Sequence, residues 1–379
     1  METHLWDYSR LLAARGIDVT VFTGTPEAVV PLQPGVTVRY HSDLDLSPYS
    51  RRPVGEPPLS TWFRKWLRAD VAAGRSGIRL VHGHNLHHFS DRPARTLNEL
   101  RDELGLRLVH TYHSVWHGES RNPAADACRG WDRHFAVSEF LSASCASELC
   151  VGAERRYLGI NVAAYRDVPV SGGGQQPGLV LLPARLIPDK GAELAIRAMH
   201  QIIGHEMSQV RPQLVLMDTQ KTVDFRGERK GFREMLEEEI DRLRIRPYVE
   251  FVEAGAQQMR NLYEAASVVI YPSVFAEPMG LAPLEAMCAA RPVVVTRIGG
   301  LEEGVVDDGE IGYLVPDRNV DKLADRIALL LDSPELARNV GLRARRHSLD
   351  HFDLEHYAGP MINEYMRQLD DGDCGTSPL

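Results

Sequence analysis

The feature that most restricts how this chain folds is the alternation of short apolar runs with longer amphipathic stretches. In the second half, each apolar run reads as a buried strand, and most are followed by apolar residues at helical spacing. The strand candidates are Leu179–Leu182, Leu214–Met217, Val249–Val252, Val268–Tyr271, Val293–Thr296 and Gly312–Val315. The helix candidates are Ala192–His200, Gly231–Leu243, Met259–Ala265 and Ala282–Cys288. This alternation predicts an α/β fold in which helices cover both faces of parallel sheets.

The first half of the chain has the same rhythm. Its strand candidates are Val19–Phe22, Val36–Tyr40, Arg79–His82, Arg107–Thr111 and His134–Val137, and its helix candidates are Leu5–Ala14, Pro93–Glu103 and Glu139–Leu149. A chain of 379 residues is too long for one ordinary core, so two domains are expected. Two Rossmann-like, doubly wound domains would face each other across a cleft, with ligand-binding motifs just after the strands.

A stretch rich in Gly, Pro and polar residues, residues 166–178, separates the two halves and reads as a linker. We therefore predict an N-terminal domain over residues 1–170 and a C-terminal domain over residues 171–350. The tail is helical in pattern, and we expect a helix over residues 351–369 to cross back to the first domain. The polar residues 370–379 are expected to fray.

Composition excludes several classes of protein. A net charge of −9 provides no excess of Lys and Arg for binding nucleic acid. No apolar run approaches the roughly 18 residues that span a bilayer, and the first residues lack the pattern of a signal peptide. The cysteines are odd in number and lack metal-ligand spacing, which favours buried thiols in a reducing compartment and predicts a cytoplasmic protein. They are Cys128, Cys145, Cys150, Cys288 and Cys374.

The richest segment for chemistry is residues 271–304. A strand ends at Tyr271, a loop carries Glu277 and Gly280, and a helix begins near Leu281 with Glu285 in its first turns. The N-terminus of a helix suits a diphosphate, and a glycine lets backbone approach a ligand closely. Two glutamates at this spacing arise by chance in any acidic protein. Here, however, a strand, a loop and a helix follow one another in the order that a ligand site needs.

With these residues the segment resembles the E-x7-E signature of retaining glycosyltransferases of the GT-B fold, in the large family 4-like group. The resemblance implies transfer of a sugar from a nucleotide-diphosphate sugar to an acceptor hydroxyl, with retention at the anomeric carbon. It also implies that Glu277 contacts the donor sugar and that Glu285 contacts the ribose. Met279, Gly280 and Leu281 would line the same donor site.

Two further positions match this family. Residues 183–191, PARLIPDKG, resemble its G-R-L-x-x-x-K-G element, in which Arg185 and Lys190 would hold the donor diphosphate. The family usually has glycine where this chain has Ala184. His113 follows a strand of the first domain in the sequence HTYHS, and the resemblance places it near the reacting sugar. A single histidine is otherwise more often structural than catalytic.

The chain also departs from the family. It starts inside the family's N-terminal motif, at Met1–His4, so the first strand and its Gly-Gly loop are expected to be missing. A coding sequence that begins upstream and a genuine truncation are the two explanations, and the first is favoured. At residues 217–219, MDT, relatives usually carry glycines. The missing motif supports a rival hypothesis, a non-catalytic or weakly active partner subunit, and a GT-B epimerase or phosphorylase is another.

No metal is expected, because basic side chains can neutralise the leaving diphosphate. Four histidines close in sequence, His82, His84, His87 and His88, have no carboxylate or cysteine at zinc-ligand spacing. The aromatic and basic stretch at residues 61–68, TWFRKWLR, could rest on an anionic membrane, but a core or substrate wall is favoured. The sequence does not identify the donor nucleotide, the acceptor or the oligomeric state.

Overall fold

The chain divides into two compact units in the computed structural model. Unit 1 comprises residues 1–159 and 354–379, and unit 2 comprises residues 160–353. The structure describes residues 2–24, 34–44, 59–72, 78–88, 91–115, 122–170, 177–218, 231–306 and 308–373. The boundaries between the units lie at Ile160 and Asp353. The expected boundaries were residues 170 and 350.

The first division lies earlier than expected because the start of the expected linker is bound within unit 2. Arg345 donates a hydrogen bond to the carbonyl of Val168 at 2.7 Å, and the buried Arg291 donates to the carbonyl of Pro169. Buried guanidinium groups need such partners, so residues 168 and 169 pack with unit 2.

Unit 2 is built on one six-stranded parallel sheet with the strand order β12-β11-β10-β7-β8-β9. Its strands are β7 (Leu179–Leu182), β8 (Gln213–Met217), β9 (Val249–Val252), β10 (Val268–Tyr271), β11 (Val293–Thr296) and β12 (Tyr313–Val315). The side chains of β7, β10, β11 and β12 are all buried. Runs of apolar, mostly β-branched or leucine residues form strands of this kind because both faces of the sheet are covered.

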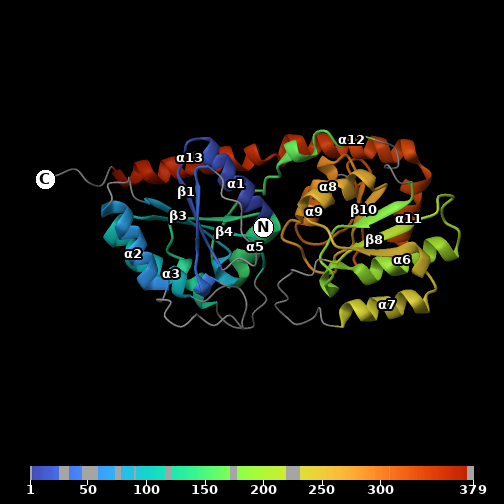
Figure 1. Ribbon diagram of the computed structural model, residues 1–379, viewed down its shortest axis with the longest axis horizontal. Helices are drawn as coiled ribbons and strands as arrows, with labels where there is room; N and C mark the ends of the chain where they lie inside the picture. Colours follow the sequence, from blue (N-terminus) through green and yellow to red (C-terminus); the bar gives the residue numbers. More distant parts are fainter. Residues whose placement is uncertain are drawn as a thin grey trace. The chain divides into compact units, whose positions relative to one another are not determined.

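Helices cover both faces of this sheet. They are α6 (Ala192–Gly204), α7 (Phe232–Arg242), α8 (Ala256–Ala265), α9 (Leu281–Cys288), α10 (Leu301–Gly304), α11 (Val320–Asp332) and α12 (Pro334–His351). Figure 1 shows α8 and α9 on one face of the sheet and α6 and α7 on the other. Helix α6 packs against α11, whereas α9 packs against α12. The arrangement is the doubly wound one that the alternation predicted.

Unit 1 differs from the single sheet that a doubly wound domain implies. Its strands form a two-stranded parallel sheet, β1 (Val19–Thr23) with β2 (Val36–Tyr40), and a separate four-stranded parallel sheet of order β3-β4-β5-β6. The strands of the second sheet are β3 (Leu80–His84), β4 (Arg107–Tyr112), β5 (Arg133–Ala136) and β6 (Glu154–Arg155). Strands β1 and β3 are largely half-buried, whereas β4 is almost wholly buried.

Both sheets of unit 1 share the same two helical layers. Val19 of β1 and Leu80 of β3 pack against a cluster formed largely by α1 (Glu2–Ala14) and α13 (Leu354–Asp373), which lie side by side in Figure 1. Phe22 of β1 and Val81 of β3 pack against a second cluster on the other side. That cluster draws on α2 (Leu59–Ala72) and α3 (Arg92–Leu104). The remaining helices are α4 (Pro123–Cys128) and α5 (Glu139–Glu148).

The aromatic stretch of α2 contributes to this core. Phe22 meets the rings of Trp62, Phe63 and Trp66 edge to face, with centroid distances of 4.9–5.7 Å. Edge-to-face packing of this kind is the preferred geometry of aromatic cores. The contacts favour the core interpretation of the aromatic stretch. Among the described residues, no helix has both the length and the apolar composition needed to cross a membrane.

The described cysteines, Cys128, Cys145, Cys150 and Cys288, are free thiols. Three are buried, as expected, and Cys150 is exposed, which the sequence analysis did not expect. Cys374 lies outside the described residues.

Candidate functional site

The strand order of unit 2 reverses between β7 and β10. From β7 the chain moves outward through β8 to β9, and from β10 it moves the other way through β11 to β12. In a doubly wound sheet, ligands bind at the carboxyl ends of the strands where this reversal occurs. The loops that leave β7 and β10 there carry five of the predicted site residues: Arg185, Lys190, Glu277, Met279 and Gly280.

Lys190 and Glu277 meet at this point as a buried ion pair. The ammonium group of Lys190 donates to Oε1 of Glu277, and the two side chains are only 10% and 7% exposed. The hydroxyl of Ser273, itself fully buried, lies 3.0 Å from the same carboxylate oxygen and 2.9 Å from the carbonyl of Asp189. The residues predicted to hold the diphosphate and the sugar of the donor are therefore in direct contact with each other.

Aromatic rings surround the ammonium group. Lys190 Nζ lies 5.7 Å from the ring centroid of Tyr271 and 5.8 Å from that of Phe275. Burial by itself would lower the pKa of Lys190, but the interactions with Tyr271 and Glu277 outweigh it and raise the pKa above its ordinary value. Burial, with the nearby Glu277, also raises the pKa of Tyr271 to about 12. Lys190 is thus held as a cation, and Tyr271 as a neutral phenol, at neutral pH.

The helix that follows β10 supplies the other predicted residues. Gly280 is the N-cap of α9, with φ at +78°, and Leu281 is its first residue. Met279 is 2% exposed, whereas Gly280, Leu281 and Glu285 are half-buried. The backbone at the start of α9 offers N–H groups that have no intrahelical partner. Arg185 lies in the loop after β7 with an exposed side chain.

The carboxylate of Glu285 has a partner that the sequence did not indicate. The hydroxyl of Tyr263, on α8, lies 2.9 Å from Oε2 of Glu285. Tyr263 and Ser273 are the residues of this site that sequence reasoning missed. A tyrosine on an amphipathic helix carries no signal of its own, whereas the Pro272–Ser273 pair that opens the β10 loop could have pointed to Ser273.

Two glycines hold the loops of the site together by close backbone contacts. A Cβ on Gly191, which has φ at +74°, would lie 1.9 Å from the carbonyl oxygen of Pro272, in the neighbouring loop. A Cβ on Gly300 would lie 2.0 Å from the carbonyl oxygen of Pro278. Gly300 also donates its N–H to the carbonyl of Glu277 at 2.7 Å. Any larger residue at these positions would push apart the loops that carry Lys190 and Glu277.

We expect Gly191→Ala to destabilise unit 2 by about 2 kcal/mol or more, because it combines backbone strain with a clash. The displaced loop should also misplace Lys190 and weaken ligand binding. Denaturation followed by circular dichroism measures the first effect. Gly204→Ala is the matched control, since no atom lies within 4 Å of a Cβ built there. Equal stability of the two variants would show that the close contact is unimportant.

Asp218, at the end of β8, marks a departure from the glycines of the resembling family. It is 6% exposed and pairs with Arg233 of α7. Arg233 also lies 3.0 Å from Glu237 and 4.6 Å from the ring centroid of Phe251. Asp218 therefore takes part in a salt-bridge network with α7.

The predicted His113 lies in unit 1, directly after β4. Its Nε2 is 2.9 Å from Nδ1 of His84, and its backbone N–H donates to the side-chain carbonyl of Asn85 at 2.7 Å. Asn85 has a positive φ of 54°, a conformation that asparagine tolerates better than most residues. Burial, together with the neighbouring His84 and His4, lowers the pKa of His113 well below its ordinary value. His113 is therefore neutral at pH 7.

Other histidines gather around this point. His82 lies 2.5 Å from the hydroxyl of Tyr365 and 2.7 Å from that of Thr111, and His4 donates from Nδ1 to the carbonyl of Gly159 at 2.8 Å. In the part of the chain that the structure describes, no group of three or more His, Cys, Asp or Glu residues has an arrangement that could hold a metal ion. His4, His82, His84 and His113 thus contact one another, hydroxyl groups or backbone.

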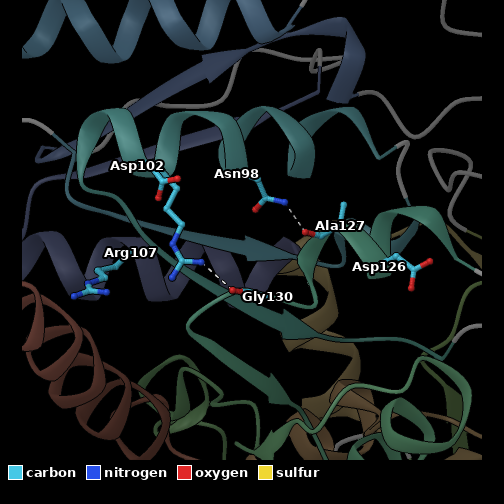
Figure 2. Close-up of a pocket in the computed structure, with 7 residues that line it drawn as sticks. Asn98, Asp102, Arg107, Asp126, Ala127 and Gly130 are labelled. Atoms are coloured by element: carbon cyan, nitrogen blue, oxygen red, sulfur yellow. Dashed lines mark hydrogen bonds between the residues drawn. The ribbon is translucent and has the colours of Figure 1, made fainter.

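A pocket at the other end of β4 is a weaker candidate. Figure 2 shows it beside α3, α4 and Arg107, the first residue of β4. Its polar groups bond to one another across the pocket wall: Asn98 donates to the carbonyl of Ala127 at 2.7 Å, and Arg101 to that of Gly130 at 2.8 Å. Because doubly wound units bind ligands at the carboxyl ends of their strands, the site between β7 and β10 is favoured.

Comparison with known families gives two matches along the chain. Residues 168–347 match the family model described as glycosyl transferases group 1, and residues 1–155 match that of glycosyltransferase family 4. A curated relative from Kribbella flavida, named D-inositol 3-phosphate glycosyltransferase, is 28% identical, covering 92% of this chain and 86% of its own length. An uncharacterized glycosyltransferase of Methanocaldococcus jannaschii is 29% identical, covering 86% of each chain.

Solved structures share the fold. A sucrose-phosphate synthase from Thermosynechococcus elongatus superposes with a TM-score of 0.74 at 23% identity, covering 97% of this chain and 93% of that one. The Anabaena protein HepE, solved in complex with UDP and glucose, gives a TM-score of 0.73 at 18% identity, covering 97% and 95%. Both matches extend over nearly the whole chain.

Proposed function

Because the chain belongs to the GT-B glycosyltransferases, with a family 4 domain at residues 1–155 and a group 1 domain at residues 168–347, we propose that it is a retaining enzyme. It moves a sugar from a nucleotide-diphosphate sugar to an acceptor hydroxyl. The observation that carries this proposal is the buried contact between Lys190 and Glu277 at the strand-order reversal of unit 2. At this point Lys190 offers a cation that suits a diphosphate, and Glu277 offers a carboxylate that suits sugar hydroxyls.

The donor would be held by groups of matching chemistry. Lys190 and Arg185 place positive charge where the leaving diphosphate gains negative charge, and the N-terminus of α9 adds N–H donors. In this proposal Glu277 accepts hydrogen bonds from hydroxyls of the donor sugar, and Glu285 accepts them from the ribose hydroxyls. Since these cations can neutralise the leaving group, we propose a reaction that does not depend on a metal, which an assay in EDTA tests.

Catalysis in this proposal relies on positioning and electrostatics. The bond between the anomeric carbon and the diphosphate oxygen breaks as the acceptor oxygen forms its bond on the same face. The acceptor proton passes to an oxygen of the leaving phosphate. No carboxylate then has to act as a nucleophile, in keeping with Glu277 being engaged by Lys190 and Ser273. Neutral His113 would contact the reacting sugar through hydrogen bonds.

Names of similar proteins suggest which substrates to test first. The HepE complex makes UDP and UDP-glucose the first donor ligands to test, and the relatives named D-inositol 3-phosphate glycosyltransferase make a phosphorylated cyclitol the first acceptor to test.

A second candidate function is a non-catalytic subunit. The split sheet of unit 1, with its half-buried β1 and β3, favours this alternative. Transfer to an acceptor, measured by release of the nucleoside diphosphate, separates the two.

The donor site itself is tested by calorimetric titration with UDP, GDP and ADP. We expect one of them to bind and Glu285→Ala to weaken that binding by about 100-fold, because hydrogen bonds to a charged group are lost. Glu303→Ala, which removes an acidic residue of α10, is the control and should bind as the parent does. If neither these three nor any other nucleoside diphosphate binds, the proposed function is wrong.

A further inference from the structure

Tyr263 connects two helices of unit 2 through its hydroxyl group. It lies near the end of α8, which precedes β10, and its side chain is fully buried. The hydroxyl reaches α9, which follows the same strand, where it lies 2.9 Å from Oε2 of Glu285 and 3.3 Å from the carbonyl oxygen of Ala282. A residue with no predicted role thus contacts a predicted ligand-binding carboxylate.

The chemistry of the two groups fixes the direction of this hydrogen bond. An ionised carboxylate only accepts, and a phenol has one proton to donate. Burial, together with the charge of Glu285 and the nearby Tyr165, raises the pKa of Tyr263 well above its ordinary value. The hydroxyl therefore keeps its proton throughout the pH range in which the protein would be assayed. The closer, charged oxygen of Glu285 is the stronger acceptor of the two.

The ring of Tyr263 is held in place independently of this bond. Tyr165, in the short helix η3 (Val162–Tyr165), meets it edge to face with centroids 5.9 Å apart and planes at 69°. Helix η3 in turn packs against α9. A ring fixed by its packing presents its hydroxyl from a constant position, so it can orient the half-buried carboxylate of Glu285.

We propose that Tyr263 is a positioning residue for donor binding: it holds the carboxylate of Glu285 in the orientation that accepts the ribose hydroxyls of the nucleotide. This inference rests on the proposed function, in which Glu285 binds the ribose. It predicts that the hydroxyl of Tyr263 matters only for ligands that have ribose hydroxyls, although Tyr263 does not touch the ligand.

Tyr263→Phe tests the proposal, because it removes one oxygen and keeps the buried ring. The ligand is whichever of UDP, GDP or ADP binds the parent protein most tightly, with its 2′,3′-dideoxy analogue for comparison. We expect the variant to bind the ribonucleotide about 10-fold more weakly, as expected for a lost charge-assisted hydrogen bond, and to bind the dideoxy analogue as the parent does. Tyr313→Phe, at another buried tyrosine of unit 2, is the matched control and should change neither.

A double-mutant cycle distinguishes positioning of Glu285 from a merely structural role of Tyr263, because it measures how the two substitutions are coupled in their effect on ribonucleotide affinity. In a Glu285→Ala background, Tyr263→Phe should cause no further loss of ribonucleotide affinity. Equal weakening for the ribonucleotide and the dideoxy analogue, additive losses in the cycle, or unchanged ribonucleotide affinity would overturn the proposal and leave the proposed function standing. If the parent binds no nucleoside diphosphate, both are overturned.

Discussion

Lys190→Met is expected to lower sugar transfer by at least about 100-fold and to destabilise unit 2 by about 3–5 kcal/mol. The activity falls because the leaving diphosphate loses a fixed positive charge. The stability falls because the carboxylate of Glu277, 7% exposed, remains buried without its counter-ion. The two effects have different causes, so they can be separated by a second substitution.

Adding Glu277→Gln to Lys190→Met should separate them. The double variant has no buried charge at this position, and its stability should return to within about 1–2 kcal/mol of the parent, since a neutral pair of similar volume is tolerated. Its activity should not return, because neither the diphosphate nor the sugar recovers its partner. A double variant that regains transfer would show that Lys190 and Glu277 only stabilise the fold.

The matched control is an exposed lysine. Lys322 lies 3.4 Å from Asp325 on α11, with side chains 58% and 49% exposed, and Lys322→Met should change stability by less than about 1 kcal/mol. Unit 2 contains no tryptophan, because the chain's five, at positions 6, 62, 66, 116 and 131, fall within residues 1–159. Its unfolding is therefore followed by circular dichroism, while tryptophan fluorescence reports unit 1 alone.

The strands of unit 2 could be predicted from sequence because a strand buried on both faces appears as a short run of apolar residues. Strands β7, β9, β10 and β11 occupy the predicted residues, and β8 and β12 differ by one residue at the start. Strands β7, β10, β11 and β12 are short runs buried at every position, since helices cover both faces of a parallel sheet, whereas β9, at one edge, carries the exposed Glu250. The loops after β7 and β10 could be located for the same reason, because strand ends define where a ligand site begins.

Contacts between distant residues could not be predicted in this way. Lys190 and Glu277 were each expected to face a ligand, but their pairing depends on β7 and β10 being neighbours, which no local pattern encodes. Tyr263 reaches Glu285 across a strand, and Ser273 reaches the carbonyl of Asp189 from the neighbouring loop. Short elements were missed too: the six-residue α4 and the two-residue β6 are too short to show periodicity.

The histidines of unit 1 lead to the second large effect, acid-induced unfolding of that unit alone. His4, His87, His110 and His113 are each less than 9% exposed. Burial lowers the pKa of His4 to about 4 and that of His87 to about 3, and it lowers those of His110 and His113 well below the ordinary value. His110 shows the cause structurally, since its Nε2 accepts the N–H of Leu86 at 3.0 Å and protonation would break this bond.

The direction of the pH dependence follows from these shifts. Because the folded pKa values lie below the unfolded value of about 6.5, the unfolded chain binds more protons as the pH falls, and stability is lost with it. At pH 5.5 each histidine should cost about 1 kcal/mol relative to pH 7, so the four together cost about 4–5 kcal/mol. A domain has only about 5–15 kcal/mol of stability in total. We therefore expect unit 1 to unfold near pH 5, seen as a red shift of tryptophan emission.

One substitution tests whether these histidines cause the transition. Nε2 of His87 lies 2.9 Å from the carbonyl oxygen of Ser114. Because a carbonyl oxygen only accepts hydrogen bonds, this nitrogen carries the proton. The amide of a glutamine can donate the same bond without titrating, so His87→Gln should move the midpoint of the transition to lower pH by a few tenths of a unit, as expected when one of four protons is removed. His356→Gln, at an exposed position on α13 in the same unit, should leave the midpoint unchanged. Identical midpoints for the two variants, or tryptophan emission that stays constant down to pH 4, would mean that burial of these histidines does not govern the acid stability of unit 1.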